Sequence, residues 1–151
     1  MARALEKTTD GKFYTRPPEI ETAIDAALAE DTASHCRRAL IRDPHHHEYL
    51  RSECLVHLIR DATRRGDDAG RDALLRLLLA RCEANLNAKV DGRIPGAVEL
   101  REDILGDFAE LFAIDGSRND RHELDFFEVC SKLPCLLGCE REQRWPHPGP
   151  F

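Results

Sequence analysis

The chain has 151 residues, of which 42% are hydrophobic and 33% charged, and its formal net charge is −6. This mixture is typical of one globular domain and excludes a disordered chain, in which apolar residues are few. The acidic balance argues against broad, non-specific binding to nucleic acid. No apolar run reaches the roughly 20 residues of a membrane-spanning helix. Because the N-terminus also lacks the apolar core of a secretory signal, we expect a cytoplasmic protein with no membrane partner.

The spacing of apolar residues predicts an all-α fold, a single-domain bundle of four to five helices joined by short loops. The expected helices are 18–41 with a break near Asp31 and Thr32, 48–65, 69–90, 97–114, and 122 to 129 or beyond. Residues 1–16 show no periodicity and are expected to form a flexible arm before the helical domain at 17–139. Residues 140–151 are expected to form an irregular, proline-rich tail.

The helix expected at 97–114 is the most clearly amphipathic. One face of this helix is predicted to carry Leu100, Ile104, Leu105, Phe108, Leu111 and Phe112. Between residues 97 and 115 there are six acids and a single base, Arg101. We therefore expect an acidic outer surface on this helix. The helix at 69–90 is the most apolar, and we expect it at the centre of the core.

Residues 99–112 read Glu-Leu-Arg-Glu-Asp-Ile-Leu-Gly-Asp-Phe-Ala-Glu-Leu-Phe, and a leucine-rich helix precedes them. After the next loop, residues 124–128 read Leu-Asp-Phe-Phe-Glu. In this order of motifs, the stretch 73–127 resembles the second conserved region of bacterial sigma factors, the helical module that docks onto RNA polymerase. The likeness covers about a third of the chain.

The resemblance implies that Glu99, Glu102 and Asp103, together with Asp107, face the RNA polymerase core at the clamp helices of its largest subunit. An acidic face of this kind is complementary to a basic partner helix, which mainly increases encounter rate and selectivity. The alternative is a solvated face whose carboxylates only favour solubility.

The chain departs from the sigma-factor pattern after the aromatic segment. In that family a long, basic and aromatic helix follows, and it captures unpaired promoter bases. Here residues 128–139 are nearly uncharged and contain Pro134. Arg141, Arg144 and Trp145 are the remaining candidates for contact with promoter DNA. No helix-turn-helix domain follows, so the resemblance implies a truncated or divergent relative in which DNA contact is secondary.

Cys130, Cys135 and Cys139 suggest a different function, a small metal-binding or redox-sensing module. Three thiolates with His122 or His147 could complete a tetrahedral zinc site. Their gaps of four and three residues match no standard zinc or iron–sulfur spacing, and the chain contains no C-x₂-C pair. A plain helical adaptor is the third possibility.

The remaining candidates for chemistry are interpreted as structural. Cys36, Cys54 and Cys82 lie among apolar helix positions, where a reduced thiol behaves as a small hydrophobic residue. Cys54 and His57 are three positions apart, but a nucleophile and base also need an orienting group and an oxyanion site. The histidines at 45–47 are expected in a polar loop at a helix entry. Since phosphate-loop and hydrolase motifs are absent, we expect a binding protein rather than an enzyme, with no cofactor and no small-molecule substrate.

Overall fold

The computed structural model describes residues 1–9 and 11–129, and most of this part of the chain is helical. The helices are α1 (Pro18–Leu28), α2 (Thr32–Ala39), α3 (Ser52–Arg65), α4 (Asp68–Lys89), α5 (Ala97–Ile114) and α6 (Glu123–Phe127). A short antiparallel hairpin of β1 (Thr8–Thr9) and β2 (Lys12–Phe13) precedes them. The predicted all-α class is confirmed. None of these helices is long and apolar enough to cross a membrane.

The ends of the helices follow local capping chemistry. The predicted break near Asp31 is confirmed: its carboxylate accepts a hydrogen bond from the Ser34 backbone N–H at 2.8 Å and starts α2. This separation of α1 from α2 raises the number of helices to six. Gly66 ends α3 in the left-handed region at φ 73°, and Asp67 caps α4 by accepting from the Gly70 N–H at 2.9 Å.

Arg81 of α4 explains why α3 begins at Ser52 rather than near residue 48. Its guanidinium donates to the carbonyl oxygens of Leu50 at 2.6 Å and Ala39 at 2.9 Å, and it lies 4.7 Å from the centre of the Tyr49 ring. These contacts hold the connection from α2 to α3 in a non-helical path against α4. Burial lowers the pKa of Arg81, because partial removal from water disfavours the charged form.

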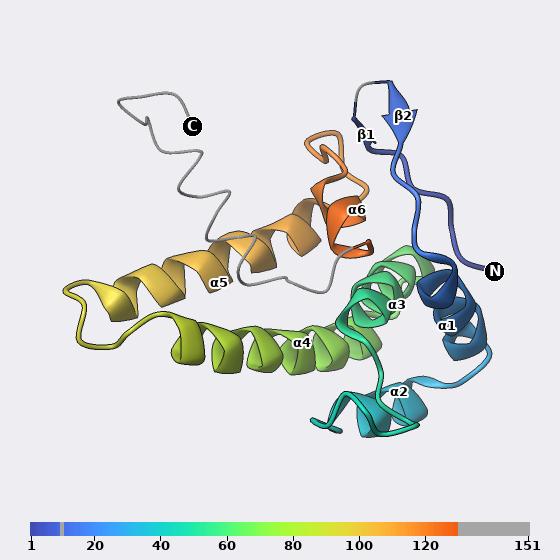
Figure 1. Ribbon diagram of the computed structural model, residues 1–151. Helices are drawn as coiled ribbons and strands as arrows, with labels where there is room; N and C mark the ends of the chain where they lie inside the picture. The colour runs from blue at the N-terminus through green and yellow to red at the C-terminus, as the bar shows by residue number, and fades with distance from the viewer. Residues whose placement is uncertain (10, 130–151) are drawn as a thin grey trace.

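The most enclosed helix is α3, because α1 and α4 pack against it and α6 also contacts it (Figure 1). Residues 53–60 are buried without interruption. The 69–90 helix was expected at the centre of the core, and α4 packs against α2, α3 and α5. Only five of the 22 residues of α4 are buried, along one stripe. α4 also runs antiparallel to α5, and the two helices form a long hairpin (Figure 1).

Fewer residues of α5 are buried than the apolar face predicted from the sequence contains. Four of its residues are buried: Ala97, Ile104, Phe108 and Phe112. The Phe108 ring packs edge-on against Phe112 and Phe127, with both ring centres at 5.2 Å, and all three side chains are buried in the core. However, Leu100 is 39% exposed, and Leu105 and Leu111 are half-buried. The predicted continuous apolar face is therefore only partly covered by the rest of the described chain.

Residues 1–16, expected to form a flexible arm, are tied to the helices at several points. The side chains of Ala2, Leu5 and Arg16 are buried. The Ala2 N–H donates to the Asp25 carboxylate at 2.5 Å. These contacts join positions far apart in the chain, so local periodicity could not reveal them.

We expect Arg81→Met to lower the free energy of unfolding by about 2–3 kcal/mol, because the Leu50 and Ala39 carbonyls would lose a charged donor. Urea denaturation followed by circular dichroism measures this change. Arg76→Met, an exposed position on the same helix, is the matched control and should change stability by no more than about 0.5 kcal/mol. Equal stability of the two variants would contradict the role assigned to Arg81.

Candidate docking site at the α5–α6 end of the helical hairpin

The short helix α6 is positioned by a buried carboxylate at its C-terminal end. Glu128 is only 1% exposed, and three side chains from distant segments donate to it. Arg16 of the N-terminal arm donates at 3.0 Å from Nε and 2.8 Å from Nη2. From α3, Arg60 donates to the second oxygen and His57 Nδ1 donates to the first at 2.7 Å. Because an ionised carboxylate can only accept, His57 Nδ1 carries the hydrogen of this bond.

Burial disfavours the charged forms of Glu128 and Arg60, and the opposite charges around them stabilise these forms. Burial alone would raise the pKa of Glu128, but the hydrogen bond and charge of His57 and the charges of Arg60 and Arg16 hold it below its ordinary value. For Arg60, burial acts to lower the pKa, whereas Glu128, Asp115 and Asp125 raise it. Each charge is therefore matched by opposite charge, as a buried ion must be.

Two further carboxylates extend this cluster to the arm and to the end of α5. Asp125 of α6 accepts from Arg60 at 2.8 Å and from the backbone N–H groups of Glu6 and Lys7 at 2.6 and 2.7 Å. Asp115, which follows α5, accepts from Arg60 Nε at 3.2 Å. The arm, α3, the end of α5 and α6 are thus joined through one set of ion pairs.

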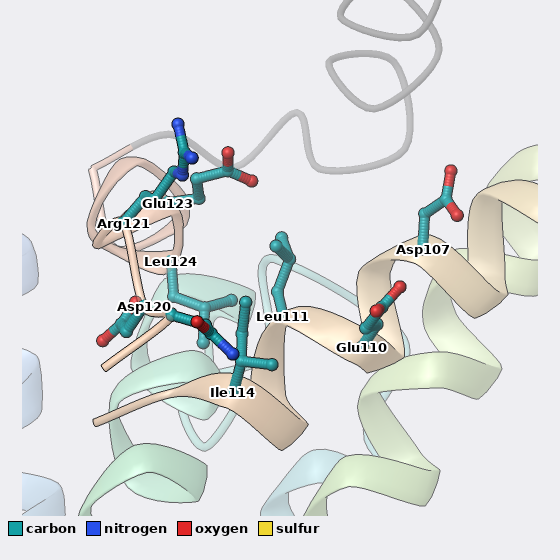
Figure 2. A pocket seen from close by; sticks show the side chains of 9 residues that line it. Asp107, Glu110, Leu111, Ile114, Asp120, Arg121, Glu123 and Leu124 are labelled. Carbon is teal, nitrogen blue, oxygen red and sulfur yellow. The ribbon is translucent and has the colours of Figure 1, made fainter. Parts of the chain in front are cut away.

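This anchoring places α6 beside α5 so that a cleft of about 230 Å³ opens between them (Figure 2). The described residues that line it are Asp107, Glu110, Leu111, Ile114, Asn119, Asp120, Arg121, Glu123 and Leu124. In Figure 2 the apolar side chains of α5 and α6 lie between the carboxylates of Asp107 and Glu110 on one side and Glu123 on the other. The cleft therefore has an apolar centre and a rim that is mostly acidic.

The loop between α5 and α6 forms one wall of the cleft and is shaped by Asp120. The Asp120 carboxylate accepts from the backbone N–H groups of Gly116 at 2.9 Å and His122 at 2.8 Å. Burial acts to raise its pKa, but these two hydrogen bonds keep it below the ordinary value. Gly116 at φ 79° and His122 at φ 58° both adopt the left-handed backbone region, which closes the loop tightly.

An acidic stripe, defined as Glu99, Glu102, Asp103 and Glu110, runs along the outer side of α5 towards this cleft. All four residues are exposed and follow one another at helical spacing. Arg101, the only base of α5, is turned away from the stripe, because its guanidinium donates to the Val90 carbonyl at the end of α4.

The predicted partner-binding residues thus lie on one helix. Glu99, Glu102 and Asp103 are exposed on the stripe, whereas Asp107 is half-buried and lines the cleft. The candidates for DNA contact (Arg141, Arg144 and Trp145) and for metal binding (Cys130, Cys135 and Cys139) lie outside the described residues. Within residues 1–9 and 11–129, no three His, Cys, Asp or Glu side chains gather as a metal site.

The remaining histidine and cysteine interpretations can be compared with the structure. His57 is buried and hydrogen-bonded to Glu128, so its interpretation as a satisfied core histidine is confirmed. Cys54 and Cys82 are buried among apolar side chains, as predicted, and Cys36 is half-buried. Burial raises the pKa of both Cys54 and Cys82 to about 12, which keeps these thiols protonated and poorly nucleophilic.

The sequence interpretation missed the ion cluster at Glu128. Arg60 gave one indication, because it follows directly on the mostly apolar run 54–59 of a predicted helix. A charged residue in that setting requires a buried partner. Nothing local to residue 60, however, points to Glu128 or Asp125 as that partner.

No protein-family model matches the chain, and no curated protein or solved structure is significantly similar to it.

We expect Glu128→Gln to destabilise the protein by about 3–5 kcal/mol, because Arg16 and Arg60 would remain buried without their shared counter-charge. Chemical denaturation measures the difference. Glu83→Gln, an exposed position on α4, is the control and should leave stability nearly unchanged. A loss below about 1 kcal/mol would mean that water or neighbouring groups replace the Glu128 carboxylate.

The effect of Glu128→Gln should also depend on pH. Because the folded-state pKa of Glu128 lies below its ordinary value of 4.5, its stabilisation is complete above that value and is lost as the pH falls towards the folded-state pKa. The difference in unfolding free energy between wild type and variant should therefore be large at neutral pH and shrink on acidification below about 4.5. A difference that stays constant throughout acidification would contradict the ion-pair origin of the effect.

Proposed function

We propose that this protein acts through protein–protein contact, that the acidic stripe of α5 binds a basic helical partner, and that this partner is core RNA polymerase. The observation that supports this proposal is the exposed row of carboxylates on α5. Glu99, Glu102, Asp103 and Glu110 are all exposed on this one helix. An acidic helix face of this kind favours a partner with a complementary row of Lys or Arg.

The chemistry of the stripe suits encounter and selection of a partner. Exposed charges interact over about 8 Å at physiological ionic strength, so several carboxylates on one face act together on an approaching basic surface. Individual exposed ion pairs contribute little affinity. The stripe would therefore mainly accelerate association and reject acidic surfaces, while affinity would require an additional contact.

The choice of RNA polymerase rests on the resemblance to the second region of sigma factors. The residues that carry this resemblance fall on α4, α5 and α6, which the structure arranges as a helical hairpin closed by a short aromatic helix. The carboxylates that the resemblance assigns to polymerase contact include three members of the exposed stripe. Contact with promoter DNA is secondary in this proposal, and no catalytic step is part of it.

Charge reversal at the stripe provides the test. We expect Glu99→Lys combined with Glu102→Lys to weaken binding to core RNA polymerase by about tenfold at low salt, with a smaller effect at physiological salt. Biolayer interferometry with immobilised polymerase core measures association and dissociation separately. The loss should appear mainly in the association rate.

The control variant combines Asp72→Lys with Glu83→Lys on the exposed side of α4, which changes net charge equally. It should retain polymerase binding within about twofold if the position of the charges, rather than their sum, determines affinity. Absence of wild-type binding at low salt, or equal losses in both variants, would reject the proposal.

A further inference from the structure

We propose that the cleft between α5 and α6 receives a bulky apolar side chain of the partner, so that the partner segment is an amphipathic helix with one apolar and one basic edge. This inference rests on the proposed function and extends it, because it names a second contact beside the acidic stripe. Its basis is the set of partly uncovered apolar residues that follows the stripe into the cleft.

Leu100, Leu111 and Ile114 occupy the flank of α5 next to the stripe. Leu100 is 39% exposed, and Leu111 and Ile114 are half-buried and line the cleft. At 1.5 Å per residue, Leu100 and Leu111 are about 16 Å apart along α5, or three helical turns. Apolar contacts over that length with charges along one side match the way an amphipathic helix lies in a groove.

The volume of the cleft and the apolar residues that line it suit one apolar side chain. Its volume of about 230 Å³ exceeds the roughly 150 Å³ of an apolar cavity that accommodates benzene. It is smaller than the roughly 300–1,000 Å³ typical of small-molecule sites. Leu111 and Ile114, both half-buried, supply the apolar contact surface. A leucine or phenylalanine side chain would therefore be desolvated there, as the central anchors of interfaces are.

The charges around the cleft indicate which polar residues the partner helix carries. Glu110 stands at the rim and continues the line of Glu99 and Glu102. Among the described residues that line the cleft, Arg121 is the only base. A partner with Lys or Arg one turn from its apolar anchor would place those cations over the rim and the stripe. A second copy of this chain fits poorly, because it would bring the same acidic stripe against itself.

The test uses two helical peptides of about 18 residues with equal positive charge, one of leucine and lysine and one of alanine and lysine. The protein variant is Asn119→Trp, which fills the cleft from an exposed lining position without changing charge. Asn87→Trp on the exposed side of α4 is the matched control. Fluorescence anisotropy measures peptide binding to the full chain.

We expect the leucine peptide to bind wild type and the Asn87→Trp variant equally and to bind Asn119→Trp about tenfold more weakly. The alanine peptide should bind all three proteins weakly and equally. Unchanged leucine-peptide binding by Asn119→Trp would overturn the inference. A wild-type dimer that Asn119→Trp converts to a monomer in analytical ultracentrifugation would also overturn it, since a second copy would then occupy the cleft.

The same variants separate this inference from the proposed function. If polymerase binding is weakened by charge reversal of the stripe but not by Asn119→Trp, the cleft is not used and the inference alone fails. If polymerase does not bind at all, the proposed function fails, while the two peptides still decide whether the cleft accepts an apolar anchor.

Discussion

The arrangement of the helices depends on the ion pairs and hydrogen bonds of the buried Glu128 carboxylate. It accepts hydrogen bonds from Arg16 of the N-terminal arm and from His57 and Arg60 of the enclosed helix α3. A buried cation or anion without its partner is far less favourable than one exposed to water, so these groups are stable only in each other's presence. The cluster therefore requires the arm, α3 and α6 to adopt their positions together.

The position of α6 links this cluster to the surface. Since α6 has only five residues, its own helical hydrogen bonds cannot hold it in place. Asp125 and Glu128 fasten it to Arg60, and Phe127 packs on Phe108 of α5. The cleft between α5 and α6 thus has a wall whose placement is determined by ion pairs in the interior.

The two surface features proposed for partner binding have different physical roles. The acidic stripe acts at a distance, increases the rate of encounter and weakens with salt. The apolar cleft acts only on contact, and removal of an apolar side chain from water would slow dissociation. A partner helix with both a basic and an apolar edge would use the two together. In this proposal, the leucines of α5 that the surrounding helices leave partly exposed supply the apolar contact.

Sequence periodicity determined the helix class, the limits of α5, the break at Asp31 and the outward direction of the α5 carboxylates. These features depend on residues three or four positions apart and on caps next to them, so local pattern contains the necessary information. Only the tertiary structure decided that α3 is enclosed, that the arm is held, that Leu100 and Leu111 are partly uncovered and that a cleft forms beside α6. Arg16 and Glu128 are separated by 112 positions, and ion pairs over such distances exist only after the chain has packed.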